Sequence, residues 1–409
     1  MSKVIRVALP GYDIRDTNLD HFSLYSDIDN LLIKRFLQGT DVVADGGTTP
    51  QTNTYNHNLG YIPFFAAFSE VDTGKWALIN NQYGSFTVPP IIAGIDTSNL
   101  KITNFQASNI NLAYDIFYDD MDQSGSPSIA ESKNVFKVAR PNKNILSTNP
   151  NDYIMHSDLN NFKILKEGSD SLTLNGLGIV TPQSINHGAN IQTPIKFFCF
   201  IKFPDGKTLL CGGSSPFNAT GQALNYDESM SVGCWADSTK IYFASYGAAT
   251  KNVTIKYYIY GSGKDNTINN SGKIISVAAN DKNVLTETNP DNFNFHSNYA
   301  TLKYYESNNW NMGSITAQTI KTIPHNLGYV PFFIGFSNDL QAFFSANTYA
   351  LMPYYLGRSD PTHPTQDVAA FMYADDTNIY LKAYYQTNAV GTPFSFNFYY
   401  KLFKNNLGL

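Results

Sequence analysis

The chain has 409 residues and a net charge of −5, with 15% charged and 14% aromatic residues, including 28 Phe and 27 Tyr. Few charges with many Tyr, Phe, Gly and Pro are typical of short strands joined by turns, and this composition excludes a helical bundle or a coiled coil. The negative net charge argues against nucleic acid and anionic membranes as partners, because both attract basic proteins. We therefore expect an all-β protein of more than one domain.

The N-terminal segment has charged residues and a proline where a secretory signal needs an apolar core. No apolar run approaches the ~20 residues needed to span a bilayer. The cysteines are odd in number and lack Cys-x-x-Cys spacing, so we predict reduced thiols at Cys199, Cys211 and Cys234. These features together predict a chain that is made and kept in a cytoplasm, or released without secretion.

The first repeated segment runs from Val7 to Asp27 and aligns without a gap with Val138 to Asp158. A third copy runs from Val277 to Asn298, and the second and third copies carry His156 and His296 where the first has Tyr25. After the first copy, Asp27 to Phe36 could form a helical turn. We predict a turn followed by a strand, because the equivalent segments in the other copies have strand-like patterns.

The second repeated segment is the strongest. His57 to Phe68 and His325 to Phe336 agree at nine of twelve positions, in the pattern His-Asn-Leu-Gly-Tyr-x-Pro-Phe-Phe. The middle third has a degenerate copy with His187 and Pro194. Repetition at this level predicts three homologous units, each about the length of one domain.

Glycine and proline in this segment predict a tight corner before an apolar strand, because glycine accepts positive φ and proline interrupts ladder pairing. We expect His57 and His325 to hydrogen-bond the corner's backbone, with Tyr61 and Tyr329 packed beside it. In the alternative interpretation each histidine is a metal ligand or an acid–base group, but two histidines per unit are too few for zinc. We therefore predict no metal site, and a structural motif made of His57, Gly60, Tyr61, Pro63, His187, Pro194, His325, Gly328, Tyr329 and Pro331.

Each unit ends in two strands whose apolar residues alternate, as in a sheet with one buried face. The penultimate strands are predicted at 99–106, 239–246 and 377–385, and the last at 112–118, 253–259 and 394–402. The alternation predicts that Asp115, Lys256, Asn397 and Lys401 face water. The pattern favours an antiparallel β-sandwich in each unit.

Polar, Gly/Ser-rich segments at 119–128 and 261–272 separate the units and are typical of linkers. They predict three tandem β-sandwich domains at 1–120, 133–261 and 272–409, arranged as beads on a string. The acidic cluster at the start of the first linker, with Asp119, is expected to be solvated. No nucleophile elbow, zinc-protease pair or dinucleotide fingerprint is present in the sequence, so we expect no enzyme and no cofactor.

The unit opens with Val-Ala-x-Pro-Gly-Tyr-Asp and continues to His-Asn-Leu-Gly-Tyr-x-Pro-Phe. In this it resembles the tandem β-domain minor virion proteins of tailed bacteriophages, such as tail, fibre and collar components. The resemblance implies a structural virion protein, assembled in the host cytoplasm, that docks to other virion proteins as a homo-oligomer, a trimer or a ring.

A second function remains open at this stage, namely a lectin-like module that binds a host surface glycan. Aromatic side chains on loops can stack on sugars. The candidates for contact with a receptor or partner are Trp310, Tyr354 and Tyr355.

Overall fold

The computed structural model describes residues 5–15, 21–26, 32–46, 49–80, 91–119, 135–174, 183–189, 191, 193–213, 230–247, 250–260, 275–278, 282–287, 292–315, 319–338, 348–352, 354–360, 363–387 and 394–409. These residues form β-strands almost throughout, in sheets that are antiparallel apart from one short parallel pair, β17 with β18. The all-β prediction is therefore confirmed. A 3₁₀ turn at Pro150–Asp152 precedes one strand.

The strands repeat in the same order in the three units. Unit 1 contains β1 (Arg6–Ala8), β2 (Phe22–Tyr25), β3 (Lys34–Val43), β4 (Gln51–Asn56), β5 (Phe65–Asp72), β6 (Lys75–Leu78), β7 (Ile91–Ile95), β8 (Asn99–Asn104) and β9 (Ile110–Tyr118). Unit 2 contains β10 (Lys137–Ala139), β11 (Tyr153–His156), β12 (Asn160–Asn161), β13 (Ile164–Leu174), β14 (Gln183–Asn186), β15 (Lys196–Lys202), β16 (Thr208–Leu210), β17 (Gly212–Gly213), β18 (Met230–Ala236), β19 (Lys240–Gly247) and β20 (Lys251–Tyr260). Unit 3 contains β21 (Ser276–Ala278), β22 (Phe293–His296), β23 (Tyr304–Ile315), β24 (Thr319–Pro324), β25 (Pro331–Ser337), β26 (Tyr349–Leu351), β27 (Tyr354–Asp360), β28 (His363–Ala374), β29 (Asn378–Thr387) and β30 (Phe394–Asn406).

The predicted strand pairs at the ends of the units correspond to β8 and β9, β19 and β20, and β29 and β30. Strand β3 follows the position where we predicted a turn and then a strand, although 27–31 lie outside the described residues. Most of the predicted linkers, at 120–128 and 261–272, also lie outside them.

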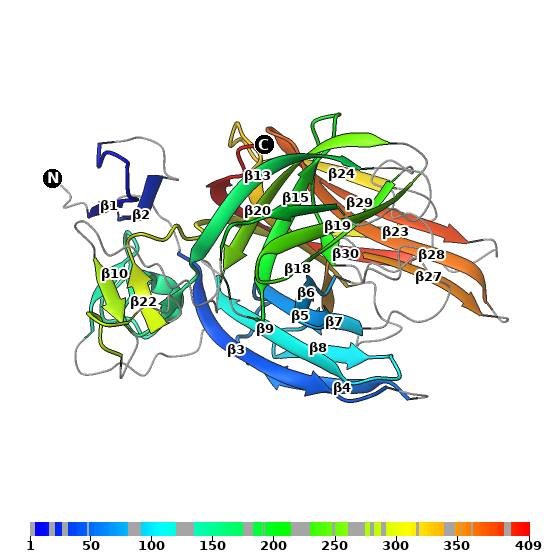
Figure 1. Cartoon of the computed structure of the whole chain (residues 1–409), viewed down its shortest axis with the longest axis horizontal. Coiled ribbons are helices and arrows are strands. Elements are labelled where there is room, and N and C mark those ends of the chain that lie inside the picture. The colour runs from blue at the N-terminus through cyan, green and yellow to red at the C-terminus, as the bar shows by residue number, and fades with distance from the viewer. Residues whose placement is uncertain are drawn as a thin grey trace.

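Each of the three large sheets is shared by two units, and together they form the body of the molecule (Figure 1). One sheet joins β3, β9, β5 and β6 of unit 1 to β18, β19 and β14 of unit 2. The next joins β13, β20, β15 and β16 of unit 2 to β28, β29 and β24 of unit 3, and the last joins β23, β30, β25 and β26 of unit 3 to β7, β8 and β4 of unit 1. The units therefore form a closed ring rather than the expected independent beads.

A single apolar core fills this ring, and it contains residues from every unit. Phe64 of unit 1 lies with its ring centroid 5.7 Å from Phe198 of unit 2 and 5.6 Å from Phe403 of unit 3. Phe198 in turn contacts Phe332 of unit 3 edge-on at 5.4 Å. Because the motif phenylalanines meet at the centre, the aromatic surplus of the sequence binds the units to one another.

The short hairpins that open the units form a separate part, which we call the head; in Figure 1 β1, β2, β10 and β22 lie together on the left. The hairpins β1–β2, β10–β11 and β21–β22 share a register shift at the equivalent position. They pack on one small core of Leu24, Leu32, Val138, Ile154, Met155 and Phe295. The first repeated segment of each unit, with a few residues that flank it, thus forms the head, and the remainder of each unit forms the body.

The prediction that charged residues of the last strands face water is wrong for Asp115 and Lys401, which are both 0% exposed. Asp119 is 0% exposed as well, so the start of the predicted first linker is buried. The alternation of one strand identifies its apolar face, but it does not show that a neighbouring unit covers the other face. Lys256 fits the prediction better, since it is partly exposed and lies 3.2 Å from Glu167.

Candidate functional site

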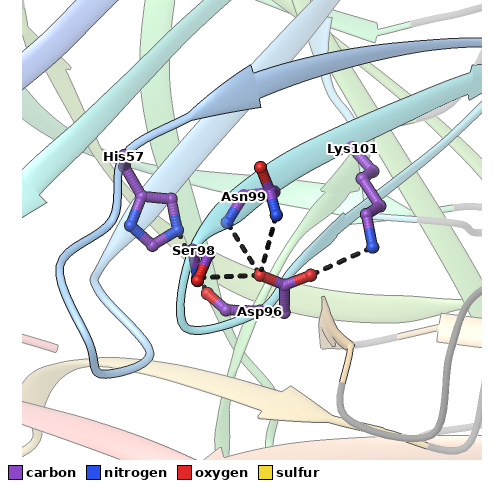
Figure 2. Close-up of polar contacts among 5 residues, drawn as sticks. All are labelled: His57, Asp96, Ser98, Asn99 and Lys101. Carbon is purple, nitrogen blue, oxygen red and sulfur yellow. Dashed lines mark hydrogen bonds and ion pairs between the residues drawn. The ribbon is translucent and has the colours of Figure 1, made fainter.

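The repeated histidine corner is built around the ring of His57, which uses both of its nitrogens on the backbone. Figure 2 shows the ring beside the turn that contains Asp96. Nδ1 accepts a hydrogen bond from the Leu59 amide at 3.2 Å, which places the ring proton on Nε2. Nε2 then donates to the carbonyl of Asp96 at 3.1 Å. The backbone amide of His57 donates to Ser98 O at 2.7 Å. The side chain therefore ties the corner to the turn before β8.

The same arrangement occurs in the other two units. His187 accepts from the Ala189 amide at 3.2 Å and bonds the Asp237 carbonyl at 3.0 Å. His325 accepts from the Leu327 amide at 3.2 Å and bonds the Asp375 carbonyl at 3.1 Å. The degenerate copy in unit 2 thus retains the histidine geometry although most of the surrounding motif is gone.

The partner aspartates were not singled out by the sequence analysis. The carboxylate of Asp96 accepts from the amides of Ser98 at 2.8 Å and Asn99 at 2.7 Å and lies 3.0 Å from Lys101 Nζ (Figure 2). Burial alone would raise the pKa of Asp96, but these hydrogen bonds outweigh it and the pKa lies below its ordinary value. The signal in the sequence is an Asp-x-Ser/Thr turn before each penultimate strand, at Asp96, Asp237 and Asp375.

This geometry leaves the corner histidine without a free nitrogen for a metal or a substrate. Burial lowers the pKa of His57 and of His187 below the ordinary value, which favours the neutral ring that the two hydrogen bonds require. Within the described residues no group of three His, Cys, Asp or Glu side chains could hold a metal ion. The histidine therefore acts as a backbone clamp, which means that its ring holds two backbone segments together through hydrogen bonds.

The other motif residues shape the corner. Asn58 and Gly60 have φ of 50° and 79°, and Asn326 and Gly328 have φ of 55° and 74°, so each corner uses the left-handed region twice. Tyr61 is 3% exposed. The peptide bond between Thr193 and Pro194 in unit 2 is cis.

Two proline positions and the second tyrosine complete the motif. Pro63 precedes β5, and Pro331 opens β25 opposite Asn406. The hydroxyl of Tyr329 donates to Lys404 O at 2.7 Å. The corner is in this way fastened to the last strand of its own unit.

Buried ion pairs connect the corners and last strands of different units. Lys401 Nζ of unit 3 lies 2.7 Å from Asp119 Oδ2 of unit 1, and Asp119 also accepts the Phe64 amide at 2.9 Å. Lys196 Nζ of unit 2 lies 2.8 Å from Asp115 Oδ2 of unit 1. Burial alone would lower the pKa of Lys401, but its interactions with Asp119, Tyr399 and Tyr304 together outweigh burial and raise the pKa. Unit 1 supplies the carboxylates, and the units on either side of it supply the ammonium groups.

The three cysteines are buried and free, as predicted for reduced thiols. Cys211 Sγ donates weakly to the Gly212 and Val232 carbonyls, each at 3.7 Å. Burial raises the pKa of Cys199 and Cys211. Cys199 and Cys211 are therefore unreactive packing groups. At Cys234 burial also acts to raise the pKa, but hydrogen bonds with Cys199 and Cys211 outweigh it and lower the pKa to about 6.

The residues predicted for receptor contact are not brought together. Trp310 on β23 is 39% exposed, and Lys321 Nζ lies 3.9 Å from its ring centroid, so one face of the ring is covered. Tyr354 and Tyr355 begin β27, in a different sheet, and their side chains lie outside the described ones. A hollow of about 460 Å³ lies elsewhere on the body. Its lining combines charged and polar residues with apolar ones, and includes Lys202, Asp205, Asp375, Asp376, Asn406, Tyr329, Val330 and Leu409.

Comparison with known proteins finds no family model, no curated protein and no solved structure that matches the chain. Among the described residues there is no helix long and apolar enough to cross a membrane.

Proposed function

We propose that this protein is an architectural component of a tailed-bacteriophage virion, a fibre, collar or other appendage of the head or tail, that acts by docking to other virion proteins. The observation that carries the proposal is the closed ring, in which every large sheet is completed by the next unit. A ring of three similar units gives one chain the approximate three-fold form that other proteins reach by assembling subunits. Such a form suits a part that sits on a symmetry axis.

The histidine corners support the same proposal. The most repeated motif of the chain clamps backbone in all three units, so the repetition serves a fixed shape. The buried ion pairs between units add to that shape, because an ion pair out of water fixes the relative position of its two elements. In this proposal self-association of whole chains is secondary, since the three-fold arrangement is already complete within one chain.

The test is a comparison of purified virions made with and without the gene for this chain. We expect the chain in the first particles by immunoblot, and a density of its size in their reconstruction that is missing from the second. Absence of the chain from purified wild-type particles contradicts the proposal. Sedimentation velocity of the free protein measures the contribution of self-association.

A further inference from the structure

Apolar side chains that face water are concentrated on the head. Of the twelve large hydrophobic residues that are exposed in the described part of the chain, nine lie on the head. Eight of these recur at equivalent positions of the repeat, in the sets Ile5, Phe136 and Ile275; Ile14, Ile145 and Val284; and Leu146 and Leu285, while the ninth is Tyr12. Clustered apolar exposure marks interaction sites, whereas scattered single residues do not.

The most exposed residues of this set lie at the hairpin tips, and the same turn holds them in each unit. The Asn144 side chain accepts the amide of Leu146 at 2.9 Å, and the Asn283 side chain accepts the amide of Leu285 at 3.0 Å. Asp13 accepts the amide of Arg15, at the equivalent position of unit 1, at 2.8 Å. Leu146 is 78% exposed and Leu285 is 84% exposed. Each tip is therefore held in a defined conformation while its side chain projects into water.

We infer that the three tips form a three-pronged anchor that seats in three equivalent apolar pockets of a homotrimeric protein. The inference rests on the proposed function and names the partner class and the surface. The three tips are equivalent in the repeat, and a partner with three equivalent pockets can bury all of them at once. Projecting side chains that enter pockets supply most of the binding energy in such interfaces. Arg15 stands at the equivalent position of unit 1, where the other two tips have leucine. The contact of this tip with the partner therefore differs from the other two.

The charges of the tips favour a protein partner over a lipid surface. Three cations lie at the tips within the described ranges of the chain. Arg15 is 3.3 Å from Asp13 and Lys143 is 3.2 Å from Asp152, so carboxylates of the same loops offset two of these charges, and Lys282 is the third cation. A membrane-binding surface would carry a cluster of several unpaired cations around its apolar residues.

The inference is tested with Leu146→Gln and Leu285→Gln, singly and together, in the full-length chain. The readout is the amount of chain that is incorporated into virions assembled in its presence. We expect incorporation to fall about tenfold for each leucine, since full burial of one leucine is of that size. Arg15→Leu is expected to raise incorporation. The matched control is Ile320→Gln, which changes an exposed residue on the body and is expected to leave incorporation unchanged.

A photoreactive residue at 146 or at 285 identifies the partner directly. The expected product joins both positions to the same residue of one polypeptide, and a photoreactive residue at 320 gives no such product. Cross-links to lipid, to a second copy of this chain, or to two different proteins overturn the inference, as does full incorporation of the double variant. In those cases the wild-type chain is still present in virions and the proposed function stands. If the wild-type chain is absent from virions, the proposed function fails and the inference fails with it.

Discussion

The body and the head use the same three-fold repetition in opposite ways. In the body the repeated aromatic residues point inward, and Phe64, Phe332 and Phe403 are all 0% exposed. In the head the repeated aliphatic residues at the tips point outward, and Leu285 is 84% exposed. Both patterns are regular in sequence, so repetition alone does not distinguish residues that hold the units together from residues that are available to a partner. Burial makes that distinction, and the following predictions test it.

The largest effect is expected from Lys401→Met in the body. Loss of the ammonium leaves Asp119 charged and buried without its ion-pair partner, and we expect the free energy of unfolding to fall by about 3–5 kcal/mol. Urea unfolding measures the change. Because the ring shares its sheets, calorimetry should show the whole body unfolding in one transition.

The control for this prediction is the double variant Lys401→Met with Asp119→Asn. Asparagine keeps an acceptor for the Phe64 amide but carries no charge, so it should recover a large part of the lost stability. A loss below about 1 kcal/mol in Lys401→Met would show that the pair is not isolated from water. A separate early transition for one unit would contradict the closed ring.

A smaller effect is expected at the histidine corners. His57→Ala removes the acceptor for the Leu59 amide and the donor to Asp96 O, and it should cost about 1–3 kcal/mol of unfolding free energy. His187→Ala and His325→Ala make the same change in the other two corners. The three costs should be similar, and added zinc should leave the melting temperature of the wild type unchanged. A large zinc-dependent shift that His57→Ala abolishes would contradict the backbone-clamp assignment.

The sequence predicted the repeated strands well because a sheet face is a local pattern. The alternation in β9, β20 and β30 and the corner at His57 both depend on neighbours in the chain, and periodicity and turn chemistry describe such neighbours. The predictions for Asp115 and Lys401 failed for the opposite reason. Their burial depends on which unit lies against the strand, and a single unit contains no signal for that.

The candidate site shows the same limit. Glycine, proline and histidine in the corner were visible as a motif, whereas Asp96 lies 39 residues from His57 in the chain and is joined to it through a carbonyl that any residue type could provide. The head was recognisable as a repeat, but no sequence pattern indicates that Leu146 and Leu285 are exposed. The local sequence around a loop leucine does not differ between a side chain that packs inward and one that projects into water.

Acidification should affect the head through His296. Burial lowers the pKa of His296 to about 4, and the nearby Lys163 lowers it further in the same direction. The unfolded chain binds the proton more readily than the folded one, so stability is fully present above about pH 6.5 and is lost as the pH falls toward about 4. We expect a loss of about 1–3 kcal/mol from this group across that window.

The measurement is a series of urea unfolding curves between neutral and acidic pH. His296→Asn cannot take up the proton and should show a shallower decline over the same window. Equal declines in the two proteins would mean that the acid sensitivity originates elsewhere.

The smallest effect is expected at the tips. Leu285→Gln should change the free energy of unfolding by no more than about 0.5 kcal/mol, because an exposed side chain makes few contacts to lose. Phe295→Leu, in the small core of the same head, should cost about 1–3 kcal/mol and serves as the internal comparison. A cost above about 1.5 kcal/mol for Leu285→Gln would place the tip in the folding core of the head rather than at an interface. We expect Leu285→Gln to leave the free energy of unfolding nearly unchanged and still to reduce incorporation into virions. That result would show that the exposed tip residues of the head serve recognition, while the residues of its small core support the fold.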